Sequence, residues 1–460
     1  MKKVVDPCCK RKPRVDPWCK RNPWYKCRGY AHFDAPVERE SAKKLVSDPP
    51  KVASHPFYPF LQYAVVTQKI EKDKTTKRVL QKPAKERKIA YAAHLDSHIY
   101  SYYAFLLSQL YETRLKELDI DDSVLAFRSL GKSNIDCAND AFDLIRKYGD
   151  CVVYATDISG FFDNLDHKIL KGMWASLLGQ EKLPDDHYAV YKSITKYSYV
   201  SRDDAFKVLG ISKNNPPCSG QRFCSVADFR EKIRAAELIK PNSETKGIPQ
   251  GSPISALLSN IYLLEFDKQL HDEISAYGGR YLRYCDDILC MVPMSYESSI
   301  RSRVKGLIED FKLTINETKT STVLFSDSSG TLQVTGGTQS NGKKPRHLQY
   351  LGFTFDGQRK LIRSAAFAKF SAKMRRGVSL AKQTARKHNK MRIASGQVRE
   401  GIWRTKLYNR YSHLGRQNFV RYGLRAAEKM ESNHIRRQLK PLWSRLAERI
   451  EKENDDLHNP

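Results

Sequence analysis

The alternation of hydrophobic and polar positions predicts short strands separated by turns and helices. Residues 280–292 read RYLRYCDDILCMV, which is an apolar run, two adjacent carboxylates and a second apolar run. The aromatic and β-branched residues on both sides favour strands, and the polar step between them favours a tight turn. The pattern therefore predicts a β-hairpin with Asp286 and Asp287 at its tip.

A second apolar run also ends in an acid. Residues 150–157 read DCVVYATD and predict a buried strand with Asp157 at its C-terminal end. A carboxylate that a buried strand delivers at its end is expected at the rim of a site rather than in open solvent. Asp163 and Asp166 follow shortly, and we expect both to cap the next helix.

The rest of the pattern predicts further elements on both sides of these acids. We expect a helix over 94–111, a Gly/Pro/Ser turn over 246–254 that runs into an apolar helix, an amphipathic helix over 298–315, a strand over 319–325, a polar Gly-rich loop over 326–344, a strand or hairpin over 348–355, and basic helices beyond 359. His94 and His98 lie one helical turn apart, and without a third ligand a core or surface role is favoured over metal binding.

Charge indicates the class of partner. The chain has 460 residues, of which 40% are hydrophobic, so it can bury a core of two or three domains or subdomains. Lys and Arg number 80 against 51 acids, and the net charge of +29 indicates a polyanion, with nucleic acid favoured over a membrane surface. No apolar run approaches the ~20 residues of a spanning helix. With a basic, Pro-rich start and ten cysteines expected as free thiols, we expect a cytoplasmic protein without a membrane partner.

The two ends of the chain are both basic and aromatic. Residues 1–54 form an extension that contains a short repeat, VDPCCKRKPR and then VDPWCKRNPW. Its aromatic residues Trp18, Trp24, Tyr25 and Tyr30 suit either stacking on RNA bases or docking on the body of the protein, and the two interpretations stay open. Residues 356–460 are rich in Lys and Arg, which suits a nucleic-acid backbone, although a charged run is usually a solvated face.

The three acids together are stronger evidence for a metal site than the Asp-Asp pair alone. An Asp-Asp pair is a common turn dipeptide, so alone it is weak evidence for a metal site. Three acids on neighbouring strands, a Gly-rich loop with Gln250 and an excess of cations together describe nucleotidyl transfer by two metal ions. We expect Asp157 and Asp286 to bridge the ions, with Asp287 pointing the other way and contributing less directly. Mg²⁺ is the expected ion, with Mn²⁺ as a substitute.

These motifs resemble those of the reverse transcriptase family. DISGFFD from Asp157 is similar to the first catalytic motif, GIPQGSPIS from Gly247 with Leu-Ser-Asn260 is similar to the template and nucleotide loop, and YCDD from Tyr284 is similar to the YxDD box. Leu351-Gly-Phe353 is similar to the motif that grips the primer. The resemblance spans about residues 75–355 and implies an α+β, right-hand polymerase fold, with fingers and a palm over 55–355 and a helical, basic thumb over 356–460.

The resemblance also implies roles for single residues. Phe162 matches the aromatic gate against a 2′-hydroxyl, Gln250 lies beside the incoming nucleotide, and the carbonyl of Ile158 completes the metal shell. Arg87 and Lys82 match the cations that hold the triphosphate, but the usual glycine before the arginine is missing, so the choice among Lys82, Lys85 and Arg87 stays open. The positions that match template and primer contacts are Gly251, Ser252, Pro253, Asn260, Tyr284, Leu351, Gly352 and Phe353.

Within the family, the sequence of residues 85–102 is most similar to that of the bacterial antiphage defence reverse transcriptases, in particular their type 2. That similarity implies a structured noncoding RNA template, copied into cDNA from dNTPs, in single or concatemeric copies. Group II intron and retron enzymes match less well. A non-catalytic, polymerase-like RNA-binding protein also stays possible, whereas Phe162 disfavours an RNA polymerase.

Overall fold

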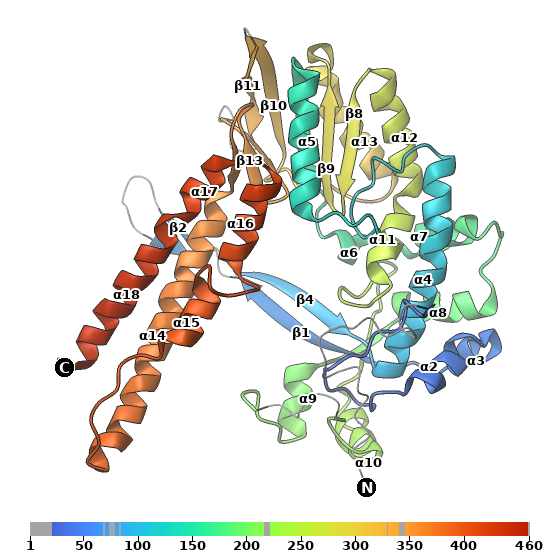
Figure 1. The fold of residues 1–460 in the computed structure, drawn as a ribbon. Coiled ribbons are helices and arrows are strands. Elements are labelled where there is room, and N and C mark those ends of the chain that lie inside the picture. Colours follow the sequence, from blue (N-terminus) through green and yellow to red (C-terminus); the bar gives the residue numbers. More distant parts are fainter. Residues whose placement is uncertain are drawn as a thin grey trace. The chain divides into compact units, whose positions relative to one another are not determined.

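The computed structural model describes residues 21–67, 70–72, 79–81, 84–215, 221–328, 330–339 and 346–458. The chain forms two compact units (Figure 1). The first unit comprises Met1–Arg128, Ile158–Asp272 and Val304–Ile315, and the second comprises Ser129–Asp157, Glu273–Arg303 and Asn316–Pro460. Each unit is therefore assembled from segments that are distant in the sequence.

The second unit is built on a five-stranded antiparallel sheet with the strand order β11-β10-β5-β9-β8. Its strands are β5 (Cys151–Asp157), β8 (Arg280–Tyr284), β9 (Asp287–Val292), β10 (Ser321–Ser328) and β11 (Thr331–Gln339). Every residue of the central strand β5 is buried, as the apolar run predicts. The predicted hairpin over 280–292 is confirmed, because β8 and β9 pair in antiparallel register.

Strand β11 corrects the prediction of a loop over 326–344 as far as residue 339, and residues 340–344 lie outside the described residues. It pairs with β10 at the edge of the sheet, and the register shifts at Leu324 and Phe325. A Cβ on Gly337 would lie 2.2 Å from the Thr322 carbonyl oxygen, so glycine is required by close backbone approach. Edge strands are commonly polar and irregular, which is why this sequence is typical of a loop.

Helices and a smaller sheet complete the second unit. The antiparallel strands β12 (Leu348–Tyr350), β13 (Phe353–Phe355) and β14 (Lys360–Ile362) confirm the hairpin expected over 348–355. The short helix η3 spans Met294–Tyr296, and the helices are α5 (Asn134–Tyr148), α14 (Ser364–Ala394), α15 (Arg404–Tyr411), α16 (Phe419–Lys429), α17 (Asn433–Leu439) and α18 (Pro441–His458). Two further helices, α12 (Leu264–Ala276) and α13 (Glu297–Asp310), have residues in both units.

The first unit contains a mixed four-stranded sheet with the order β4-β1-β6-β7 and a two-stranded sheet of β2 and β3. The strands are β1 (Phe60–Thr67), β2 (Ile70–Lys72), β3 (Val79–Gln81), β4 (Lys85–Tyr91), β6 (Ser198–Ser201) and β7 (Lys240–Pro241). The helices are α2 (Arg39–Val46), α3 (Pro49–Ala53), α4 (His94–Glu117), α6 (Phe161–Asn164), α7 (His167–Leu177), α8 (Asp185–Thr195), α9 (Arg202–Val208), α10 (Val226–Asp228), the π-helix η2 (Phe229–Arg234) and α11 (Ser255–Tyr262). Helices with a central antiparallel sheet confirm the predicted α+β class.

The expectation of helix capping is confirmed for one acid and wrong for the other. Asp166 precedes α7, and its carboxylate accepts from the backbone N–H groups of Lys168 and Ile169 at 2.9 and 3.0 Å. Asp163 lies inside the short helix α6. No helix in the described part of the chain is long and apolar enough to span a bilayer.

The N-terminal aromatic residues dock on helix α4. Trp24 and Tyr25 are each 6% exposed. Tyr25 stacks on His98 with ring centroids 4.8 Å apart, and Tyr30 stacks on His94 at 5.1 Å. Docking is thus confirmed for these residues, while Trp18 lies outside the described residues. Both histidines are buried core residues, as favoured above.

The expectation of free thiols is confirmed for five cysteines and wrong for one. The free cysteines are Cys137, Cys151, Cys224, Cys285 and Cys290. Cys27 is disulfide-bonded.

Replacing His98 with phenylalanine should flatten the acid branch of the stability profile. Burial, and then Arg28 and His94, lower the pKa of His98 to about 4, below its value of 6.5 in an unfolded chain. Its contribution to stability is therefore complete above pH 6.5 and is lost as the pH falls towards 4, because only the unfolded chain takes up the proton. Between pH 7 and 4, wild type should lose about 2–3 kcal/mol more than His98→Phe in denaturant unfolding. Parallel profiles would contradict this.

Candidate active site

The two acid-bearing elements meet inside the second unit. Strand β5 pairs with β9 so that Asp157, the last residue of β5, lies opposite Asp287, the first residue of β9. Residues directly opposed in an antiparallel pair project from the same face of the sheet. The expectation that Asp287 points away is therefore corrected, because β9 begins at Asp287 itself. Asp286 precedes it in a two-residue turn, in which Cys285 has a φ of 61°.

Asp157 lies close enough to Asp286 and Asp287 for its charge to raise the pKa of both. Asp157 is 7% exposed, and Asp286 and Asp287 are half-buried. Burial, followed by the charge of Asp157, raises the pKa of Asp286. Burial, followed by the charges of Asp286 and Asp157, raises the pKa of Asp287 to about 7. Asp286 and Asp287 therefore resist ionisation beside Asp157 unless a further cation lies next to them.

The donor set fits a hard divalent cation. Carboxylate oxygens are the ligands that Mg²⁺ prefers, and a cation would relieve the repulsion that raises the two pKa values. In the ranges that the structure describes, no three His, Cys, Asp or Glu side chains are already arranged to hold a metal ion. Binding would therefore require side-chain adjustment of these acids.

Two residues that the sequence analysis missed hold Asp157. The Lys319 ammonium lies 2.6 Å from Asp157 Oδ1, and the Asn316 side-chain amide donates to Oδ2 at 3.3 Å. The backbone N–H of Asn316 also donates to the Asp157 carbonyl at 2.6 Å. The sequence signal for these two residues was the polar turn NETKT, which directly precedes β10. Because β10 pairs with β5, this turn lies beside the end of β5 that carries Asp157.

A buried cation supports the acid-bearing turn. Arg283 on β8 is fully buried, and its Nη1 donates to the Cys285 carbonyl at 3.1 Å. This bond fixes the backbone immediately before Asp286. An arginine in the middle of an apolar strand was a readable signal, because a buried guanidinium requires acceptors.

The predicted primer-grip residues form a tight hairpin in the same unit. Tyr350 pairs with Phe353, so Leu351 and Gly352 form a two-residue turn with φ values of 45° and 92°. Both positive φ values are typical of a type I′ turn. The Asn134 amide donates to the Leu351 carbonyl at 3.1 Å and to the Tyr422 hydroxyl at 2.9 Å.

This hairpin lies near the acids. The charge of Asp287 is among the causes, after burial, that raise the pKa of Tyr350. Phe353 is fully buried and stacks on Tyr422, so its side chain supports the hairpin rather than facing a primer. Tyr284, at the end of β8, is half-buried.

The predicted nucleotide-binding residues gather in the first unit. The backbone N–H of Ile248 donates to the Phe162 carbonyl at 2.9 Å, which joins the Phe162 segment to the Gly-rich loop. Gly247 has a φ of 86°, and a Cβ there would lie 2.9 Å from the Asp163 carbonyl. Phe162 is half-buried and packs against the buried Phe161 at 5.7 Å.

The same loop is tied to strand β4. The backbone N–H of Ala90 donates to the Gln250 carbonyl at 2.9 Å, and β4 also carries the exposed Arg87. Phe162, Gln250 and Arg87 are thus connected through three adjoining segments. Lys82 lies outside the described residues.

Other predicted residues of this unit differ in exposure. Gly251 is exposed and Pro253 half-buried, whereas Ser252 is 6% exposed. Asn260 is fully buried and its amide donates to the Ala126 carbonyl at 2.9 Å, so its side chain braces the core instead of facing a template. Ile158 is buried and forms a bridge with Ile315.

Comparison with known proteins decides the family. A family model described as reverse transcriptase (RNA-dependent DNA polymerase) matches residues 101–355, more than half of the chain. The chain belongs to the reverse transcriptase family. This membership, with the antiparallel sheet and its helices, confirms the predicted polymerase fold.

Individual relatives are more distant. The Retron Se72 reverse transcriptase of Salmonella heidelberg (strain 579083-10) is 26% identical over 174 residues, which cover 34% of this chain and 44% of the retron protein. The match thus spans less than half of that relative. Apo telomerase from Candida tropicalis, truncated from its C-terminal domain, is 11% identical to this chain and has a TM-score of 0.36. The alignment covers 66% of this chain and 57% of the telomerase chain. For telomerase from Candida albicans in complex with a fragment of telomeric RNA, the identity is 14%, the TM-score 0.34 and the coverages 71% and 49%.

Substituting Gly251 with alanine should loosen the Gly-rich loop of this reverse transcriptase. Gly251 has a φ of 123°, and a Cβ would lie 2.7 Å from the Ala90 carbonyl, so the loop would have to move away from β4. We expect a loss of about 1–3 kcal/mol in the free energy of unfolding. The matched control is Gly172→Ala in α7, where a Cβ meets nothing within 4 Å and stability should be unchanged or higher. Equal melting temperatures for the two variants would contradict this interpretation.

Proposed function

We propose that this reverse transcriptase is an RNA-directed DNA polymerase that copies a structured noncoding RNA into cDNA. The observation that carries the proposal is the placement of Asp157 and Asp287 on facing strand ends, with Asp286 in the adjoining turn. Three neighbouring carboxylates, two of which have raised pKa values, are expected where a reaction needs divalent cations. Family membership makes nucleotidyl transfer the fitting reaction.

Two Mg²⁺ ions, or Mn²⁺ in their place, are the proposed cofactors. Asp157, Asp286, Asp287 and the carbonyl of Ile158 would hold them. When bound, such ions activate a 3′-hydroxyl and neutralise the charge of a triphosphate and its leaving pyrophosphate. Because Asp157 and Asp287 share a face of the sheet, both carboxylates reach the same side of the strand ends.

Neighbouring side chains would keep Asp157 in place. Lys319 balances its charge in the metal-free protein, and Asn316 fixes the second carboxylate oxygen and the backbone carbonyl. Two of these contacts restrict the Asp157 side chain and the third holds its backbone, so little further conformational entropy is lost when the carboxylate is fixed for metal binding. These residues are positioning residues for the acids in our proposal.

The nucleotide would be bound by residues of the first unit. Arg87, with Lys82 as a further candidate, supplies positive charge for the triphosphate. Gln250 can both donate to and accept from a base, and its loop is held by backbone bonds that leave the side chain free of that task. Phe162 would exclude a ribose 2′-hydroxyl by steric contact, which selects dNTPs.

Several of the predicted residues would contact the template and the primer. The proposed contacts are the exposed or half-buried residues Gly251, Pro253 and Tyr284 and the Leu351-Gly352 turn. We further propose that residues 1–54 are an extension, 55–355 the fingers and palm, and 356–460 a helical, basic thumb. The thumb carries an excess of Lys and Arg suited to a duplex backbone.

A role in bacterial antiphage defence is part of the proposal. It rests on the similarity of residues 85–102 to the type 2 defence enzymes and on the match to a retron reverse transcriptase. The proposed partners are the noncoding RNA, its cDNA product and dNTPs, in the bacterial cytoplasm. Sequencing nucleic acid that co-purifies with the protein would identify the template.

Replacing Asp286 or Asp287 with asparagine should abolish metal-dependent dNTP incorporation. Each change removes one anionic oxygen donor at nearly constant volume, and loss of a metal ligand costs several kcal/mol of transition-state stabilisation, on the order of a 10³-fold fall in rate. RNA binding should persist. The matched control is Asp310→Asn, an exposed acid on α13, which should incorporate dNTPs at the wild-type rate. Wild-type synthesis by either hairpin variant would refute the catalytic assignment, and absence of synthesis by wild type would favour a non-catalytic RNA-binding role.

Exchange of Phe162 for valine should weaken selection against ribonucleotides. A smaller side chain removes the steric conflict with a 2′-hydroxyl, and one such contact changes selectivity about 10- to 100-fold. The ratio of rNTP to dNTP incorporation efficiency on a primed RNA template measures the effect. Phe162→Tyr keeps the ring and serves as the control. If Val and Tyr variants select alike, Phe162 is not the gate.

A further inference from the structure

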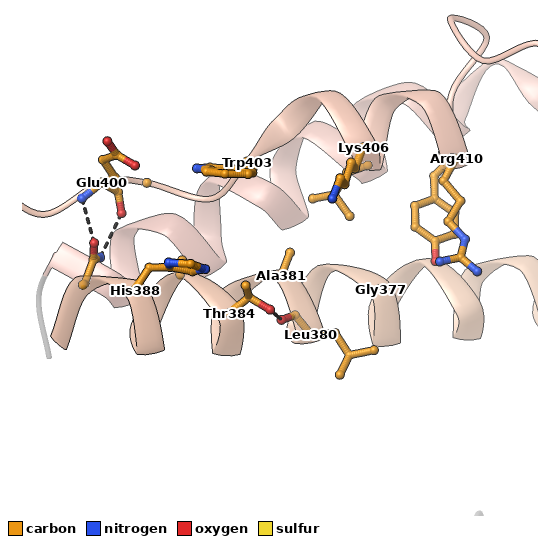
Figure 2. A pocket seen from close by; sticks show the side chains of 14 residues that line it. Gly377, Leu380, Ala381, Thr384, His388, Glu400, Trp403, Lys406 and Arg410 are labelled. Carbon is orange, nitrogen blue, oxygen red and sulfur yellow. Dashed lines mark hydrogen bonds between the residues drawn. The ribbon is translucent and has the colours of Figure 1, made fainter. Parts of the chain in front are cut away.

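The C-terminal helices contain a groove that the proposed polymerase reaction does not use. It lies between α14, residues 400–403 and α15, and has a volume of about 340 Å³ (Figure 2). That volume is in the range of sites that bind small molecules or single nucleotides. All of its walls belong to the second unit.

Small residues on one face of α14 form the floor. Gly377, Ala381 and Ala385 recur every four residues, so they share a face and leave a furrow along the helix. One end is closed by Tyr411, whose ring would collide with any Cβ on Gly377. The other end is closed where the Asn389 amide donates to the Glu400 carbonyl at 2.9 Å. The groove is therefore a built feature with defined ends.

A flat, exposed aromatic surface lies above this floor. Trp403 is 66% exposed, although it is the largest side chain of the groove. Its ring is stacked with that of His388, with an interplanar angle of 16° and centroids 6.2 Å apart. Figure 2 shows the Trp403 ring extending over α14, with Lys406 and Arg410 following along the same wall. The exposed indole beside a groove offers a flat apolar surface on which a planar ligand can stack.

Nearly all charged side chains on the helices that form the groove are positive. Helix α14 contains nine Lys and Arg and no acid, and α15 contains three Lys and Arg and no acid. The acid that lines the groove, Glu400, is paired with Arg392 at 3.0 Å. Lys406 and Arg410 are both exposed beside the groove. A planar group linked to a phosphate could thus stack on the Trp403 ring while the phosphate meets the cations further along the same wall.

We propose that this groove binds an unpaired base of single-stranded RNA, which stacks on Trp403 while its phosphates contact Lys406 and Arg410. The proposal rests on the proposed function, because it assigns part of the RNA partner to this site. A paired duplex would present its phosphates but hide its base faces, so it would leave the indole unused. An apolar protein segment would cover the indole but leave the cations without partners.

The test compares single-strand and duplex affinity in the full-length protein without metal or dNTPs. The probe is a fluorescently labelled 12-nucleotide single-stranded RNA, and the reference is a blunt RNA–DNA hybrid of the same length. Trp403→Ala should weaken binding of the single strand about 5- to 50-fold relative to the hybrid, since stacking on one aromatic residue has an effect of this size. Trp403→Phe, which keeps a ring, should restore most of the affinity. The control is Met391→Ala, which removes an apolar side chain that is 73% exposed and lies outside the groove lining.

Direct contact has a second readout. Binding of the single strand should quench indole fluorescence in wild type but much less in Trp403→Phe. The proposal would be overturned if Trp403→Ala bound the single strand with unchanged affinity, or if its affinity for the hybrid fell equally. It would also be overturned if only the oligomeric state changed, because the groove would then bind a second copy of the chain. Since binding is measured without catalysis, wild type that fails to incorporate dNTPs but shows Trp403-dependent binding would refute the polymerase function alone.

Discussion

Repulsion among three desolvated carboxylates is the constraint on which the centre of the second unit depends. Asp157 and Asp287 face one another because β5 and β9 pair in a fixed register, and the two-residue turn holds Asp286 beside them. A slip of one residue would send one of the facing acids to the opposite face of the sheet and remove the repulsion. Instead, a fully buried strand and its neighbours enforce the arrangement, so the stability of the sheet offsets the cost of bringing like charges together.

Two neighbouring cations stabilise the acids and their turn in different ways. Lys319 supplies a positive charge at Asp157, and its side chain is 48% exposed, so solvent screens the pair and a stronger cation can replace it. Arg283 acts differently, because it is fully buried and bonds to the backbone of the turn. One cation is thus suited to exchange with a metal ion, whereas the other is a permanent part of the turn.

Sequence predicted the acids more readily than the groups that hold them. The hairpin and β5 were predictable because apolar periodicity and a terminal acid are local patterns. Lys319 and Asn316 could not be assigned, because their contact with Asp157 depends on the pairing of β10 with β5, and Lys319 lies 162 residues from Asp157 in the chain. Strand β11 was missed for a related reason: an edge strand with adjacent glycines lacks the apolar alternation by which strands are recognised. The burial of the Asn260 and Phe353 side chains was not predictable, since a motif identifies a loop but does not show which of its side chains are buried.

The two ends of the chain have a similar basic and aromatic composition, but their tryptophans differ in burial and therefore in the role that each can have. Trp24 and Trp403 both lie in segments rich in cations and rings, and composition alone suits RNA binding at either position. Trp24 is 6% exposed and packs edge-on against Tyr102, so its surface is already used by the fold. Trp403 is 66% exposed above a furrow of small residues and beside exposed cations. The free energy that a base gains by stacking is available only where the protein has left a ring uncovered, and this difference assigns ligand binding to the C-terminal groove rather than to Trp24 in the N-terminal extension.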